Sequence, residues 1–121
     1  LKRLPLQLTL TFSEEQVEIW SPFDRIKKKV IENDSSGIPD VNAIHDHLVS
    51  VKQKFPTESK IVFLPHSSAS YDNLIAIMDA MRIYESSDPP LFVEDKKSGL
   101  QYSVTTLFPQ IIFGNLLEEA S

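Results

Sequence analysis

The residues best suited to catalysis in this chain are His66, Ser67, Ser68 and Asp72, which lie close together in the sequence. A histidine beside serines and a carboxylate has the residue types of a hydrolytic site, where a base activates a hydroxyl nucleophile. The sequence around them lacks the pattern of a nucleophile elbow, and no second base is placed to orient the histidine. We therefore predict a binding domain and not an enzyme, with no catalytic residue and no cofactor site.

His45 and His47 are the next candidates, because histidine is the commonest metal ligand. They fall within a predicted helix, where two positions differ by about 200° around the axis, so one ion cannot bind both side chains. The chain has no cysteine, which excludes thiolate metal sites, thiol catalysis and disulfides. The sequence predicts no metal site, with both histidines at the surface or at the boundary of the core.

Charge limits the classes of partner. The formal net charge is −5 at pH 7 and the sequence pI is about 5.1, which argues against nucleic acid, since its binding normally requires a basic face. The basic run Lys27, Lys28 and Lys29 could touch an anionic surface such as a lipid headgroup or a cell-wall polymer. Short charge runs are more often a solvated face, and that is the expectation here.

The first half of the chain predicts a hairpin, a short strand and a helix. Apolar residues alternate with polar ones from Leu4 to Phe12, which is typical of a strand with one buried face, and a turn at 13–16 leads to a second strand ending near Trp20. Residues 21–39 contain a short strand within a connection. Asp40 is placed as the N-cap of an amphipathic helix that ends before Pro56.

The second half predicts a central strand at 61–64, ended by Pro65, and a helix beginning at Ser70. Its apolar stripe comprises Tyr71, Leu74, Ile75, Ile77, Met78, Met81 and Tyr84. An extended arm with a Lys-Ser-Gly turn follows at 91–104. The last strand runs from Gln110 to Phe113 and is ended by Gly114.

These elements predict an α+β fold over a single domain, 1–121: a two-layer sandwich with a ββαβαβ-like mixed sheet and two helices on one face. Strands at 61–64 and 111–113 are apolar on both sides, although only one side would face the helices. Something must cover the other side or the sheet edge, and a second copy of the chain is the commonest cover. We predict a homodimer, with Gln110, Ile111, Ile112 and Phe113 as the interface.

Several segments resemble the ExbD/TolR biopolymer-transport family over most of the chain. "KIVFLPHSSASYDNLIAIMDAMR" (60–82) is similar to that family's strand, short loop and helix. "LTLTFSEEQVEIW" resembles its first hairpin, "VNAIHDHLVSVKQKFP" its first helix and "LFPQIIFGN" the closing segment of its longer members, including gliding-type ones. Residues 21–39 and 85–106 are less typical, and Pro65 and His66 stand where the family often has an aspartate.

The resemblance implies the periplasmic domain of a single-pass bacterial inner-membrane protein that couples the proton motive force to work. Its transmembrane helix, with the proton-carrying residue, would lie outside this chain, which begins at Leu1 and not at methionine. The implied partners are an ExbB/TolQ-type membrane protein, bound through that helix, and a TonB/TolA-like protein or a gliding machinery. Which of these systems the domain serves is left open.

Two alternatives remain. TolR-like members suggest a peptidoglycan-binding domain, for which Trp20, Tyr71 and Tyr102 are the aromatic side chains with polar tips. The other is a small intracellular α/β module that binds a ligand or regulates another protein. A pull-down with purified cell wall tests the first alternative. The sequence encoded upstream of Leu1 tests the second, because an intracellular module would lack the apolar helix that the family has there.

Overall fold

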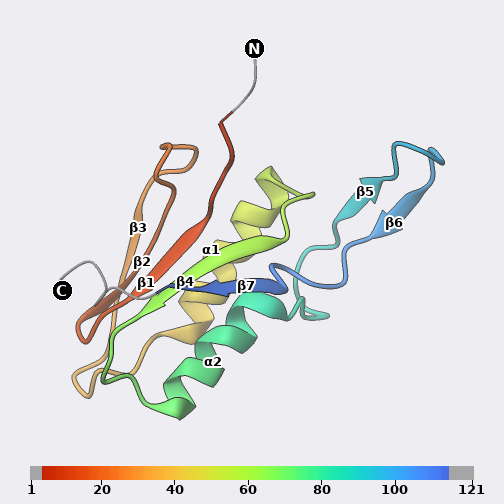
Figure 1. Cartoon of the computed structure of the whole chain (residues 1–121). Helices are drawn as coiled ribbons and strands as arrows, with labels where there is room; N and C mark the ends of the chain where they lie inside the picture. The colour runs from red at the N-terminus through yellow and green to blue at the C-terminus, as the bar shows by residue number, and fades with distance from the viewer. Residues whose placement is uncertain (1–3, 115–121) are drawn as a thin grey trace.

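The computed structural model describes residues 4–114 as an α+β fold of two layers. Five strands form one mixed sheet in the order β3-β2-β1-β4-β7: β1 (Thr9–Phe12), β2 (Gln16–Trp20), β3 (Lys29–Glu32), β4 (Lys60–Pro65) and β7 (Gln110–Phe113). Helices α1 (Val41–Lys54) and α2 (Tyr71–Arg82) lie against one face of this sheet (Figure 1). The predicted fold class is confirmed.

The first hairpin forms as predicted, with a shorter first strand. Leu10 pairs with Ile19 in the antiparallel register, and both side chains are buried toward the helices. The turn is closed by Ser13, whose backbone N–H and hydroxyl both donate to the carbonyl of Gln16. The predicted strand from Leu4 begins only at Thr9, because Gln7 has a φ of 44° and interrupts the extended backbone.

Both helices begin at the predicted caps. Asp40 accepts a hydrogen bond from the N–H of Ala43 at 3.1 Å, and Ser70 accepts one from Asn73 at the same distance. The predicted stripe on α2 is only partly buried. At about 100° per residue, Ile75 points away from the face that Ile77 and Met81 share, and it is exposed.

Two other members of that stripe lie outside the core. Tyr71 is the first residue of α2 and is 75% exposed, so the ring has little to pack against. Tyr84 follows the end of the helix, packs against the core and donates its hydroxyl proton to the carbonyl of Pro89. The predicted apolar stripe therefore extends two residues past the end of the helix, which is Arg82.

The core lies between the helices and the face of the sheet that they cover. Parallel pairing of β1 with β4 and of β4 with β7 requires crossovers, which α1 and α2 provide. The largest fully buried side chains come from both layers: Phe12, Phe63, Phe108, Leu8, Leu10, Ile19, Ile44, Leu48, Ile61, Ile77, Met81 and Leu107. This core fixes β4 and, through it, the strand β7.

Strands β5 (Phe92–Glu94) and β6 (Gln101–Ser103) form a separate antiparallel pair, the arm, which projects from the body of the molecule (Figure 1). Gly99 has a φ of 72° in the turn between them, a backbone conformation that favours glycine. The predicted extended arm with a Lys-Ser-Gly turn is confirmed. Neither helix among residues 4–114 has the length and apolar content needed to cross a membrane.

Candidate interaction surface

The β7 edge, Gln110–Phe113, forms one border of the sheet, as its predicted interface role requires. Ile111 and Phe113 pair with Ile61 and Phe63 of β4, so they point toward the helix layer. Phe63 is fully buried, whereas Phe113 remains 54% exposed although its ring centroid lies 5.6 Å from that of Phe63. The core therefore covers only part of Phe113.

The backbone of β7 has one side paired and one side open. Gln110 donates its N–H to the carbonyl of Ser59, and Gly114 donates to that of Phe63, each at 3.0 Å. Alternate residues of a parallel strand bond to the same neighbour, so the N–H and C=O groups of Ile111 and Phe113 point away from β4. Within residues 4–114 no further strand lies beyond them. This edge can accept another strand.

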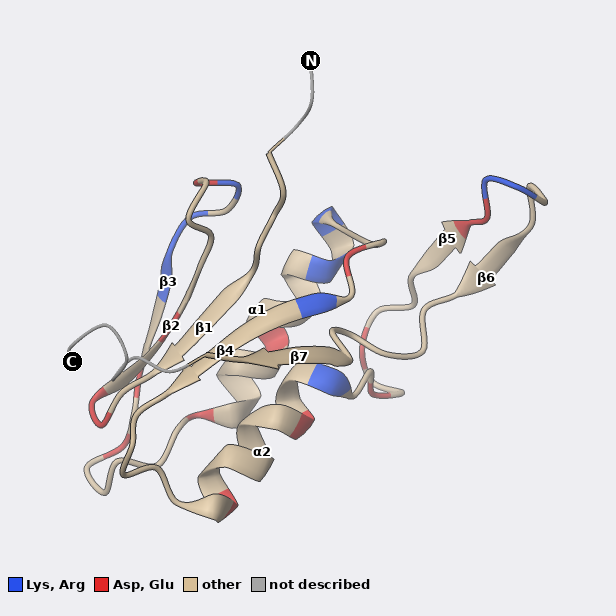
Figure 2. Ribbon diagram, viewed as in Figure 1, with Lys and Arg blue, Asp and Glu red and all other residues tan. Residues whose placement is uncertain are grey.

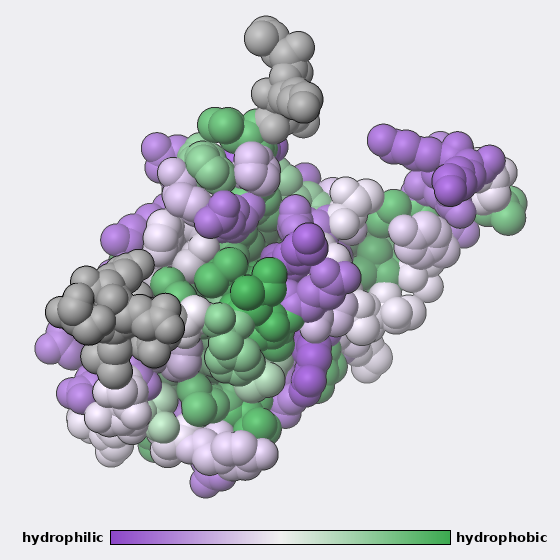
Figure 3. Space-filling view, in the orientation of Figure 1, coloured by the Kyte–Doolittle hydropathy of each residue, from purple (hydrophilic) through white to green (hydrophobic). Residues whose placement is uncertain are grey.

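The face of the sheet opposite the helices, the open face, is apolar near β7. Trp20, Thr9, Val62 and Ile112 form one row across β2, β1, β4 and β7, and Ile112 is 49% exposed. Figure 3 shows hydrophobic surface in the middle of the side turned to the viewer, where β1, β4 and β7 lie. No helix in the described part of the chain covers it.

A shallow hollow of about 250 Å³ adjoins this row. It is bordered by Pro5 and Gln7 of the N-terminal segment and by Val62 and Ile112 of the strands. An apolar side chain from a partner that pairs with β7 could enter this hollow, because every second residue of an added strand would face it.

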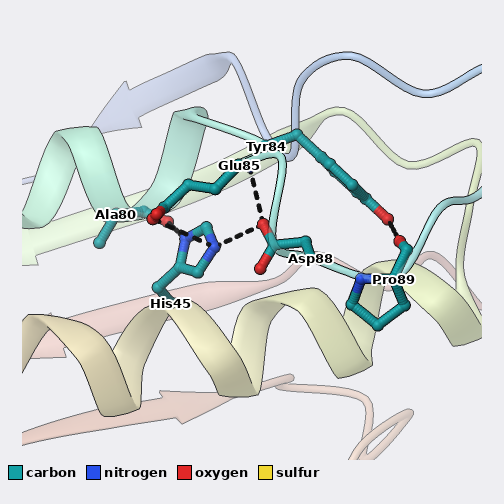
Figure 4. A network of polar contacts seen from close by, with 6 residues as sticks. All are labelled: His45, Ala80, Tyr84, Glu85, Asp88 and Pro89. Carbon is teal, nitrogen blue, oxygen red and sulfur yellow. Dashed lines mark hydrogen bonds and ion pairs between the residues drawn. The ribbon is translucent and has the colours of Figure 1, made fainter.

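The arm presents further exposed apolar residues. Phe92 is 60% exposed, Leu100 70% and Tyr102 54%, and all belong to the arm or its turn. The base of the arm is held to the helices by a polar network around His45 (Figure 4). The network therefore holds the base of the arm to the helices, and the exposed apolar side chains lie further out along the arm.

His45 is the centre of that network and is 6% exposed, so its predicted surface or boundary position is wrong. Its Nδ1 lies 3.1 Å from the carbonyl oxygen of Ala80 on α2, and its Nε2 lies 2.7 Å from Asp88 Oδ2 and 3.6 Å from Glu85 Oε2 (Figure 4). Both ring nitrogens face acceptors, so the doubly protonated imidazolium fits the site best. Burial is tolerated because both nitrogens have partners.

The charges around His45 agree with this protonation state. Burial alone would lower the pKa of His45, but the bonds to Asp88 and to the Ala80 carbonyl, with the charges of Asp88 and Glu85, outweigh it and raise the pKa. Asp88 also accepts the backbone N–H of Glu85 at 2.8 Å. The network thus joins α1, α2 and the loop that leads into the arm.

His47, by contrast, faces another side of α1 and a basic environment. Burial lowers its pKa first, and the charges of Lys29 and Lys54 lower it further. The two rings have different neighbours, carboxylates and a carbonyl for His45 and lysines for His47. No group of three or more metal-ligating side chains could hold an ion among residues 4–114.

Among residues 4–114, the side chains considered for catalysis are not joined to one another by hydrogen bonds. The ring of His66 packs against Phe12 with centroids 4.9 Å apart, and its Nδ1 is buried without a hydrogen-bond partner among the described residues. The hydroxyl of Ser70, four residues further along the chain, caps α2. Within residues 4–114 no serine hydroxyl is hydrogen-bonded to the imidazole, the contact through which a base activates a hydroxyl nucleophile.

The aromatic residues proposed for a polysaccharide site lie on three different elements. Trp20 is in β2 and donates its Nε1–H to Thr11 Oγ1 at 3.0 Å on the open face. Tyr71 begins α2 in the other layer, and Tyr102 lies on the arm. The three rings do not form one stacking platform.

Sequence reasoning found the β7 edge from its apolar run and missed the His45 network. Asp88 is forty-three positions from His45, and only folding brings them together. In comparisons with known proteins, no family model, curated protein or solved structure matches the chain significantly.

Proposed function

We propose that this chain is the partner-binding periplasmic domain of an ExbD/TolR-type component of an energy-transducing system in the bacterial inner membrane. In this role the domain performs no chemistry. It binds a second copy of itself and an extended segment of a TonB/TolA-like or gliding-type partner, while a transmembrane helix outside this chain couples to an ExbB/TolQ-type protein and to the proton motive force.

Two observations support the family reading. The resemblance covers the first hairpin, both helices, β4 and β7, and the fold it implies is a mixed sheet with two helices on one face, which is the fold described above. The elements that resemble the family least, β3 and the arm, are additions at the border of that sheet or outside it.

The open β7 edge is the observation that carries the binding role. An apolar edge strand with outward N–H and C=O groups is the surface that β-strand addition uses: main-chain hydrogen bonds supply affinity, and alternate side chains supply specificity. Phe113 and Ile112 would contact such a strand on its two faces, since they point to opposite sides of the sheet. The predicted interface residues Gln110, Ile111, Ile112 and Phe113 thus remain the proposed site.

A direct test is the oligomeric state of the domain from micromolar to millimolar concentration, measured by size-exclusion chromatography with light scattering. We expect reversible dimers, weakened at least tenfold by Phe113→Glu. The matched control is Phe92→Glu, which adds the same charge at a similarly exposed phenylalanine of the arm. A monomer at every concentration, or equal weakening by both variants, contradicts the proposed interface.

A proline variant separates edge pairing from side-chain contact. Ile111→Pro removes an N–H that points away from β4, so the sheet itself should persist while strand addition is blocked. Ile112→Pro removes an N–H that points toward β4 and should destabilise the domain. If Ile111→Pro lowers the melting temperature as much as Ile112→Pro, the outward assignment of that backbone group is wrong.

The family reading is tested separately, in the full-length protein. We expect it to fractionate with the inner membrane and to co-purify with a polytopic ExbB/TolQ-type protein encoded nearby. A full-length protein without an apolar helix would instead support the intracellular module. A pull-down with purified cell wall tests the peptidoglycan alternative, in which binding should survive Phe113→Glu.

A further inference from the structure

A basic groove lies on the side of the molecule away from β7. It runs between the loop that joins β2 to β3 and the last two turns of α1, and its volume is about 610 Å³. Four permanent cations line it, with one carboxylate, Asp24: Arg25, Lys27, Lys28 and Lys54. This concentration of positive charge is unexpected in a chain of formal net charge −5. Figure 2 shows lysine and arginine along that loop and at the end of α1.

Few of these cations are neutralised by the protein itself. Lys28 pairs with Glu18 on the open face at 3.2 Å. In the described part of the chain no carboxylate lies within ion-pair distance of Arg25, Lys27 or Lys54. Like charges that share a groove repel one another, so an anion between them would lower the electrostatic energy.

The loop that carries three of the cations is rigidly held. Ser21 is buried, donates its hydroxyl proton to the carbonyl of Leu6 at 2.6 Å and accepts the N–H of Phe23 at 3.2 Å. Arg25 donates to the carbonyl of Leu4, and its guanidinium carbon lies 5.2 Å from the ring centroid of Phe55. A loop fixed in this way loses little entropy when a ligand binds.

His47 lines the same groove, and its protonation should depend on whether an anion is bound there. Burial and the neighbouring Lys29 and Lys54 lower its pKa, so the ring is neutral at pH 7. Facing it are Arg25, Lys27 and Lys28 from the loop, Lys29 from β3, Lys54 from its own helix and the carboxylate of Asp24. A bound anion would offset the cations and favour the protonated ring, so binding should strengthen as pH falls.

We propose that the basic groove binds a phosphate group that carries at least two negative charges, as in a phosphate monoester or pyrophosphate. A carboxylate supplies one charge, whereas the three cations without an ion-pair partner among the described residues, Arg25, Lys27 and Lys54, are best matched by a ligand with more. Arginine offers the bidentate fork that suits phosphate oxygens, and lysines add charges from either side. The phosphate could belong to a free metabolite or to a lipid headgroup. The groove lies beside β3, at the sheet border opposite β7, so this site is independent of the proposed function.

The test is a titration of the domain with pyrophosphate, followed by amide and histidine NMR signals. We expect shifts confined to residues 24–28 and the end of α1, and affinity for the same ionic form of pyrophosphate that increases between pH 7.5 and pH 6. Vesicles of phosphatidylglycerol or phosphatidic acid, with phosphatidylcholine as the neutral reference, form the second arm. Lipid binding that soluble pyrophosphate displaces identifies a headgroup site, and binding of pyrophosphate alone identifies a free ligand.

Charge-matched variants decide whether the groove is specific. Lys27→Gln with Lys54→Gln removes two cations from the groove, and Lys96→Gln with Lys97→Gln removes two from the turn of the arm. We expect at least tenfold weaker binding in the first variant and less than twofold in the second. Equal losses, or no localised shifts at millimolar pyrophosphate, would overturn the proposal. Thermal melting without ligand shows that each variant is folded.

Discussion

The two borders of the sheet differ in what they offer to another strand. The β3 border has Lys29 and Glu32 at its ends, and Lys28, the residue before it, pairs with Glu18 of β2. The β7 border has no charged residue and exposes Ile112 and Phe113. Charged side chains on an edge strand are a common protection against unwanted pairing, because they must be desolvated when a strand approaches. The protein protects one border and leaves the other available.

Phe63 of β4 and Phe113 of β7, whose rings are in contact, also differ in how much of the side chain is buried. Phe63→Ala should lower the free energy of unfolding by about 3–5 kcal/mol, because it empties a fully buried site. Phe113→Ala should cost about 1 kcal/mol, since more than half of the side chain is already exposed. Urea unfolding of both variants, at a concentration where the domain is monomeric, measures this contrast. Equal losses would mean that Phe113 is a core residue and β7 is not a free edge.

A similar contrast exists along α1, whose two histidines face opposite charges. His45 faces carboxylates, so its folded pKa is above the usual value near 6.5, and the stability it adds is present below that value and lost as pH rises through the folded pKa. His47 faces lysines and has a lowered pKa, so its contribution is present above about 6.5 and lost as pH falls through the folded pKa. The two histidines therefore change the stability of the fold in opposite directions as pH rises.

His45→Gln tests the first of these. It leaves Asp88 nearly buried without its charged partner, so we expect a loss of about 2 kcal/mol at pH 6 that shrinks as pH increases. His47→Gln should instead reduce the loss of stability that occurs as pH falls below about 6.5, because glutamine does not take up a proton. Urea unfolding between pH 5 and pH 9 provides the curves. Parallel curves for wild type and His45→Gln would show that the imidazolium does not stabilise the fold.

Sequence patterns predicted the elements well where the signal was local. The predicted alternation from Leu4 to Phe12 is confirmed in part, since the apolar residues from Leu6 onward are buried and Leu4 is exposed. The caps Asp40 and Ser70 and the end of the last strand before Gly114 depend on neighbouring residues, and the structure confirms them. The strand boundary at Thr9 was missed because Gln7 is not a residue type that announces a positive φ.

Long-range features were the ones that the sequence could not supply. Burial of His45 depends on Asp88 and on the Ala80 carbonyl, which tertiary folding brings to it. The basic groove likewise needs Lys54 beside the loop before β3, so a run of three lysines reads as an ordinary solvated face in the sequence. The apolar run at Gln110–Phe113 indicated a surface that needs cover, but the strand order that makes β7 a border follows from the crossovers.

If charge is what prevents pairing at β3, removing its charged residues should make this border behave like β7. In a Phe113→Glu background, where the β7 edge is blocked, Lys29→Leu with Glu32→Leu removes both charges from β3. We expect association to return, with dimers at least tenfold tighter than in the background variant, about 1.4 kcal/mol. The reason is that the new edge would combine open main-chain groups with apolar side chains. Light scattering across a concentration series measures it.

The matched control also replaces one acidic and one basic residue by leucine, but on a helix. Asp79→Leu with Arg82→Leu removes an exposed ion pair from α2, and this adds apolar surface without any unpaired strand edge. If association were a matter of apolar surface alone, this variant would also dimerise. We expect it to stay monomeric, because a helix has no main-chain groups to offer a partner strand. Dimers in the control but not in the β3 variant would mean that side-chain hydrophobicity, and not the open backbone, decides which border of the sheet pairs.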